Sequence, residues 1–94
     1  MGMNRYRGRI AKFSTNDAIN KELVLLVDVE VYVEDKDTWN KYRDHLWLSA
    51  KGFSRSKQNN ITVFLAKEYT YGIEGDKLGL TVKAPKTISY YKGK

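Results

Sequence analysis

The sequence predicts a small all-β domain: a five- to six-stranded antiparallel barrel with little helix, formed by residues 1–94 as a single domain. Three observations lead to this prediction. Apolar and polar residues alternate in several separate stretches, which is the period of a strand and not of a helix. β-branched and aromatic residues dominate these stretches. Turn-forming residues separate them.

The first expected strand is RYRGRIAKF, residues 5–13. Three alternating arginines occupy one side of it until Ala11 and Phe13 take over the arginine parity. This change of side indicates either a solvated outer end or a bulge near Gly8. Turn-forming residues at 14–20 end the strand.

The clearest strand is KELVLLVDVEVYV, residues 21–33. Every odd-numbered position from Leu23 to Val33 is apolar, and the even-numbered face turns polar from Asp28 onward. The pattern predicts a long strand, with its odd-numbered face buried along the whole length.

Residues 35–50 are ambiguous, because aromatic residues at helical spacings precede the alternating stretch HLWLS. We expect a strand at about 44–50, preceded by at most one helical turn. Trp47 lies between two leucines and is expected to pack in the core. The polar stretch 51–60 is expected to be a flexible connection.

The last third of the chain continues the strand pattern. ITVFLAKEYTY predicts a strand over 61–71, in which Tyr69 and Tyr71 share the parity of the apolar residues and complete the core. The remaining expected elements are a turn at 72–76, a strand at 77–83 and, after the interruption at Pro85, a short strand at 86–91.

This number of strands favours a barrel of the OB type over an SH3-like barrel or an immunoglobulin-like sandwich. The segments DHLWL, ITVFLAKEYTYG and KLGLTVKAPKTISYY, in the second half of the chain, resemble small OB-type β-barrel proteins of phages and mobile elements. The resemblance implies OB architecture and a nucleic-acid context. It assigns no role to an individual residue.

The composition argues against catalysis and metal binding. The chain has no cysteine and one histidine, which excludes disulfides, thiolate zinc sites and multi-histidine metal sites. His45 follows Asp44, but neighbours in a strand point to opposite faces and cannot pair directly. There is no phosphate-binding glycine loop and no nucleophile-elbow motif. We expect a non-enzymatic protein with no catalytic residue, no metal site and no cofactor.

The longest apolar run, residues 23–27, is too short to span a bilayer. The beginning of the chain is charged where a signal peptide would be apolar. We therefore expect a cytoplasmic protein that does not contact a membrane.

Charge is distributed unevenly over a chain whose net charge is +6. Residues 22–37 hold six acids and one base, whereas the rest holds sixteen bases and five acids. Basic grooves with aromatic faces are typical of proteins that bind single-stranded nucleic acid. We therefore expect binding of single-stranded DNA or RNA with little sequence preference. The expected contact residues are Arg5, Arg7, Arg9, Lys51, Phe53, Arg55 and Lys57.

This hypothesis requires the cations of the first strand and those of residues 51–57 to become neighbours when the barrel closes. Phe53, between a glycine and a serine, is expected to be exposed for stacking. Asp28 and Glu30 would repel phosphates from the second strand, and alternating arginines also suit a simple solvated face. The alternative is a protein–protein module or inhibitor from a phage or plasmid, which acts through the acids of residues 28–37.

Overall fold

The computed structural model describes residues 3–18, 20–73, 75, 77–83 and 85–92. These residues form an antiparallel sheet with three short 3-10 turns and no α-helix in the described part, which confirms the all-β class. The elements are β1 (Asn4–Asn16), β2 (Lys21–Val33), η1 (Glu34–Lys36), β3 (Thr38–Ser49), η2 (Arg55–Lys57), β4 (Ile61–Tyr71), β5 (Lys77–Lys83), η3 (Pro85–Thr87) and β6 (Ser89–Tyr91).

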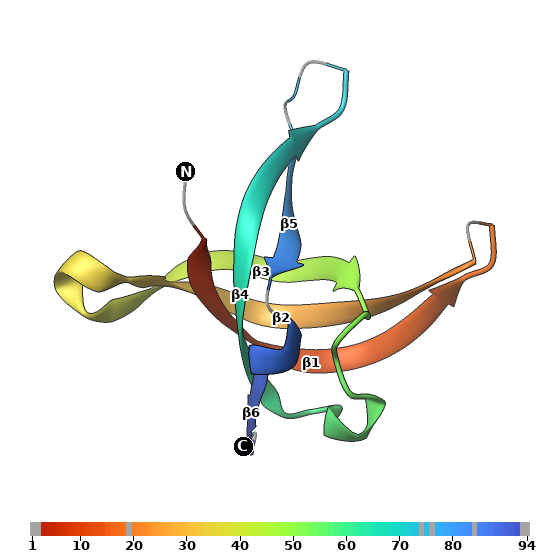
Figure 1. Ribbon diagram of the computed structural model, residues 1–94, viewed down its shortest axis with the longest axis horizontal. Coiled ribbons are helices and arrows are strands. Elements are labelled where there is room, and N and C mark those ends of the chain that lie inside the picture. The colour runs from red at the N-terminus through yellow and green to blue at the C-terminus, as the bar shows by residue number, and fades with distance from the viewer. Residues whose placement is uncertain (1–2, 19, 74, 76, 84, 93–94) are drawn as a thin grey trace.

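The strands follow the order β3-β2-β1-β4-β5, and β6 pairs with β4. Figure 1 shows β1, β2 and β3 running across the view, with β4 and β5 rising from them. The sheet curls so that its two end strands, β3 and β5, contact each other. No ladder joins these two strands among the described residues. The small antiparallel architecture is confirmed, but the barrel is open along one seam and not closed.

Two register shifts between β1 and β2 decide which side chains are buried. Opposite Gly8, β2 contains one extra residue, and Asp28 adopts a left-handed conformation with a φ of 53° there. A second shift inserts Ala11 into β1. Each extra residue reverses the alternation of its strand. The irregularity predicted near Gly8 is therefore present, although its extra residue belongs to the partner strand.

The prediction that β2 buries its odd-numbered face throughout is wrong. Val24 and Leu26 are buried before the extra residue, and Val29 is buried after it. Leu23 and Leu25 lie on the outer face and are only half-buried. The sequence did not reveal this change of side, because both parities of β2 are apolar from Leu23 until Asp28 and either set could have been buried.

β3 begins at Thr38 and is therefore longer than the predicted strand, although a single 3-10 turn precedes it as expected. Trp47 is 43% exposed, so its expected place in the core is wrong. Leu46 and Leu48 fill the core instead, and the alternation of the strand turns the indole between them outward.

β4 also buries the face opposite to the predicted one. Phe64 and Ala66 are buried, whereas Tyr69 and Tyr71 are each 48% exposed. The same inner face holds Thr62, which is fully buried, and its hydroxyl donates to the carbonyl oxygen of Ser89 at 3.1 Å. This hydrogen bond satisfies the buried hydroxyl of the threonine.

A single core lies on the inner side of the curled sheet. Phe53, from the connection between β3 and β4, inserts into it, with its ring centroid 5.6 Å from that of Phe64. This connection therefore covers the core and does not extend into solvent. The buried apolar residues are Tyr6, Ile10, Val24, Leu26, Val29, Leu46, Leu48, Ala50, Phe53, Phe64, Ala66 and Leu80.

Two tyrosines meet where β1 and β3 face each other across the core. The ring centroids of Tyr6 and Tyr42 are 5.1 Å apart in an edge-to-face arrangement. The Tyr42 hydroxyl is buried without an aligned hydrogen bond among the described residues. Burial, and secondarily the neighbouring Glu68 carboxylate, raises the pKa of Tyr42 to about 12.

We predict that Asp28→Val destabilises the protein by about 1–2 kcal/mol, because a β-branched residue fits the left-handed conformation poorly. Asp28→Gly should change the free energy of unfolding much less, since glycine adopts this conformation freely. Urea denaturation of both variants measures the difference. Equal stability of the two variants would show that the extra residue does not hold β2 in this conformation.

We also predict an alkaline loss of stability that depends on Tyr42. Because folding raises the pKa of Tyr42 above its ordinary value of 10.0, its contribution is fully present below about pH 10 and is lost as the pH rises towards 12. Urea denaturation between about pH 9 and 12 should show a smaller loss for Tyr42→Phe than for the wild type. The exposed Tyr91→Phe is the control and should follow the wild type. Identical pH profiles for all three proteins would contradict the assignment.

Candidate functional site

Four cations lie in line on the outer face of β1. Arg5, Arg7 and Arg9 point outward because the residues between them are buried. The extra residue at Ala11 then turns Lys12 to the same side. Alternate residues of a strand are about 6.6–6.8 Å apart, so the charged groups are spaced regularly along the strand. We call these four residues the cation track.

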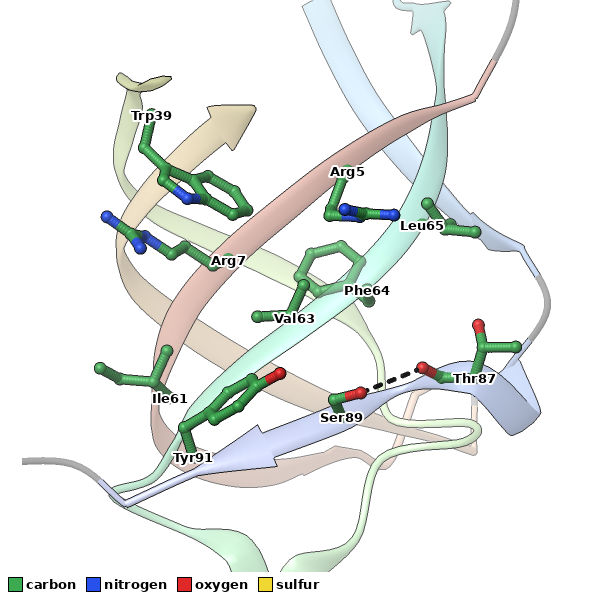
Figure 2. A pocket seen from close by; sticks show the side chains of 10 residues that line it. All are labelled: Arg5, Arg7, Trp39, Ile61, Val63, Phe64, Leu65, Thr87, Ser89 and Tyr91. Carbon is green, nitrogen blue, oxygen red and sulfur yellow. Dashed lines mark hydrogen bonds between the residues drawn. The ribbon is translucent and has the colours of Figure 1, made fainter. Parts of the chain in front are cut away.

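A groove of about 510 Å³ lies beside the track, between β1 and β6. Its floor is formed by Ile61, Val63 and Leu65 of β4, which pair directly with the three arginines of β1. Trp39 stands on the β1 side and Tyr91 of β6 on the other (Figure 2). The site therefore combines a cationic wall with an apolar floor and two aromatic rings. We call it the β4 groove.

Arg7 is held by two partners at the edge of this groove. Its Nε lies 2.6 Å from Oε1 of Glu30, and its Cζ lies 4.4 Å from the centroid of the Trp39 ring. Both members of the ion pair are about one-third exposed, so water only partly screens their interaction. Glu30 thus positions Arg7 beside the indole and offsets part of its charge.

A second indole lies at the Lys12 end of the track. The Nζ of Lys12 is 5.7 Å from the centroid of the exposed Trp47 ring. Leu25 of β2 pairs with both residues, so the three side chains form one row across the outer face. The track therefore has one tryptophan beside Arg7 and another beside its last residue, Lys12.

Two carboxylates share this face, as the sequence suggested. Asp28 and Glu30 line a shallow depression together with Arg7 and Arg9. Glu30 is paired with Arg7, whereas Arg5 and Arg9 form no ion pair within the described part of the chain. The track consequently keeps a net positive charge of two against these carboxylates.

The structure separates the two groups of cations that were expected to meet, so the combined contact surface that the sequence hypothesis required does not form. Phe53 is only 8% exposed, so its expected role as an exposed stacking residue is wrong. Arg55 pairs with Glu22 at 3.1 Å, and its Cζ lies 5.5 Å from the centroid of the Phe13 ring, on the core side. Lys57 lies over the ring of Tyr90, which also packs against the core.

Lys51 does not join the track either, because it lines a groove at the open seam of the barrel. The connection between β3 and β4 follows the core side of β1, whereas the three arginines face outward. Of the seven predicted contact residues, the structure brings together Arg5, Arg7 and Arg9. It places the other four elsewhere.

Sequence reasoning did not include Trp39, Tyr91 and Lys12 among the expected contact residues. Trp39 was assigned to a possible helical turn, but it belongs to β3. Tyr91 reaches the groove only because β6 pairs with the beginning of β4. The position of Lys12 could have been predicted from the change of side at Ala11 in the sequence. An extra residue at Ala11 moves Lys12 onto the face that carries the arginines.

The outer face offers contacts for binding and no arrangement for acid–base chemistry at His45. Asp44, next to His45 in the sequence, pairs with Lys41 at 2.6 Å. His45 is exposed and pairs in register with Val27. The described residues contain no group of three or more potential metal-ligating side chains. None of the described helices is long and apolar enough to cross a membrane.

Comparison with known proteins adds no family to this geometry: no family model, no curated protein and no solved structure matches the chain.

Proposed function

We propose that this protein is a non-enzymatic, cytoplasmic protein that binds single-stranded nucleic acid along the cation track, with little sequence preference. The proposal rests above all on the register of β1. This register aligns Arg5, Arg7, Arg9 and Lys12 on one face, with tryptophans beside Arg7 and Lys12. Cations spaced along an extended strand suit successive phosphates, and aromatic rings suit bases of any sequence.

The apolar part of the outer face supports the same proposal. Ile61, Val63 and Leu65 form the floor of the β4 groove, and Leu23 and Leu25 lie half-buried on the outer face of β2. A sheet whose outer face met only water would carry polar residues at these positions. Bases that unstack from one another can lie against such surfaces while their phosphates face the cations.

Arginine side chains suit this role better than lysines would. The planar guanidinium group makes two parallel hydrogen bonds to a phosphate, and it also stacks on aromatic rings. Arg7 already lies over Trp39, and the Cζ of Arg5 lies 5.8 Å from the centroid of the Tyr32 ring. The proposed site thus holds its arginines near aromatic rings before a ligand arrives, which lowers the entropy lost on binding.

We predict that Arg5→Ala/Arg9→Ala weakens binding of a single strand of about 30 nucleotides at least tenfold at low salt. Fluorescence anisotropy titrations between about 50 and 200 mM salt measure the affinity and its salt dependence. Each lost phosphate contact should lower the slope of log K against log salt by about 0.7 on a single strand, or about 1.4 for the double variant.

The matched control is Arg55→Ala/Lys57→Ala, which removes the same charge from the connection on the core side. This variant should bind within about threefold of the wild type, a loss smaller than that of one typical contact. Equal losses in the two double variants would show that net charge, and not the track, governs binding. If the wild type binds no oligonucleotide at low salt, the proposal fails, and a protein partner for the acids of residues 28–37 becomes the favoured alternative.

We further predict that Glu30→Gln tightens binding about three- to tenfold at low salt. The change releases Arg7 from its ion pair and removes a carboxylate that faces the phosphates, at nearly constant volume. The same anisotropy titration measures the gain, with Asp17→Asn in the exposed turn between β1 and β2 as the control for charge. Unchanged or weaker affinity of Glu30→Gln, relative to this control, would place the bound strand away from Arg7.

A further inference from the structure

The open seam of the barrel forms a second groove, outside the β4 groove. Its volume is about 610 Å³, and it lies where β3 and β5, the two ends of the sheet, come together with no ladder between their described residues. Trp47 and Ser49 line it from β3, and Leu80 and Thr81 line it from β5. We call it the seam groove.

The charge of the seam groove has one sign. Lys21 and Lys51 line it, and none of its lining residues in the described part of the chain is acidic. The β4 groove differs in this respect, because Glu30 pairs with Arg7 at its edge. The two charged residues that line the seam groove in the described part of the chain therefore favour an anion.

Tyr69 supplies an exposed aromatic ring at this groove. It is 48% exposed and packs across Gly79 of the neighbouring strand. The packing is so close that a Cβ at position 79 would lie 2.6 Å from Cζ of Tyr69. Because Gly79 has no side chain, the Tyr69 ring can lie against β5 at this position. Nearly half of the surface of Tyr69 still faces solvent.

Trp47 connects the seam groove with the cation track. Its ring is contacted by Lys12, the last residue of the track, and the same side chain lines the seam groove. Leu23, which also lines the groove, lies on the outer face of β2 next to this row. A chain that follows the track to Trp47 therefore arrives at the mouth of the seam groove.

We propose that the single strand bound by the cation track continues past Trp47 into the seam groove. There a base stacks on Tyr69, and the adjoining phosphates contact Lys21 and Lys51. This inference rests on the proposed function and extends it, because it defines how far the bound strand reaches. It also gives Lys51 a role at a site other than the one expected from the sequence.

The inference predicts that affinity depends on the length of the strand. The track from Arg5 to Lys12 covers seven residue steps, or about 23 Å, which is the length of only a few extended nucleotides. A short oligonucleotide is fully bound by the track, whereas a longer one also occupies the seam groove. Residues of the seam groove should therefore matter only for the longer strand.

The test compares oligothymidylates of about four and about fifteen nucleotides, both within the usual range of site sizes for one OB-type domain. Anisotropy titrations of Lys51→Ala/Tyr69→Ala should show about a tenfold loss for the longer strand and less than a twofold change for the shorter one. The comparison is made between proteins at the same length, because a longer strand also offers more binding registers.

The control for charge is Lys67→Ala, which removes an exposed lysine of β4 that does not line the groove. It should bind both strands as the wild type does. Tyr69→Phe keeps the aromatic face and should also bind normally, so a loss caused by misfolding near Gly79 would be recognised. Circular dichroism melting of each variant completes the control.

Three results would overturn the inference. If both strands bind the wild type and Lys51→Ala/Tyr69→Ala binds each of them with wild-type affinity, the bound strand ends at the track. In that case the proposed function stands. If this variant loses affinity for both lengths by the same factor, the seam groove is not an extension reached only by longer strands. If neither strand binds the wild type at low salt, the proposed function fails and the inference fails with it.

Discussion

The extra residue of β2 at Asp28 is the constraint on which both faces of the sheet depend. It reverses the alternation of β2, so that Val29 enters the core and Glu30 faces Arg7 on the outside. Gly8 on the opposite strand leaves room for this change, since a Cβ there would lie 3.3 Å from Cγ2 of Val29. The extra residue Ala11 in β1 then places Lys12 in line with the arginines. Core packing and the outer charge pattern thus both follow from the two register shifts between β1 and β2.

The outer face combines features that oppose each other. Its apolar residues on β2 and β4 are more numerous than a solvated face requires, and the stems of the arginines cover part of them. Its cations attract anions, but Glu30 occupies Arg7 and Asp28 lies close by. A bound polyanion has to replace Glu30 as the partner of Arg7. Such a face is therefore consistent with the proposed binding, at moderate strength. The exposed Trp47 and Tyr69 continue the same mixture of apolar and cationic groups around the open seam.

Strand positions could be predicted from the sequence, because alternation, turn residues and β-branched content act locally. The faces were harder to predict. In the first halves of β2 and β4 both parities are largely apolar, so hydrophobicity alone could not show that Leu26 and Phe64 are inside while Leu25 and Val63 are partly outside. Phe53 has polar neighbours in the sequence, but its ring is buried against Phe64 in the core. Burial follows from which strands become neighbours, and a local pattern does not contain that information.

The sequence by itself determined the all-β class, the approximate strands, the absence of thiol chemistry, and the alignment of Arg5, Arg7 and Arg9 on one side of a strand. These properties depend on residue type and on a spacing of two, which need no partner. Only the tertiary structure decided that the barrel stays open at β3 and β5, that Trp39 and Tyr91 flank the arginines, and that residues 51–57 cover the core. Each of these depends on contacts between residues far apart in the chain, and one shift of register is enough to change them.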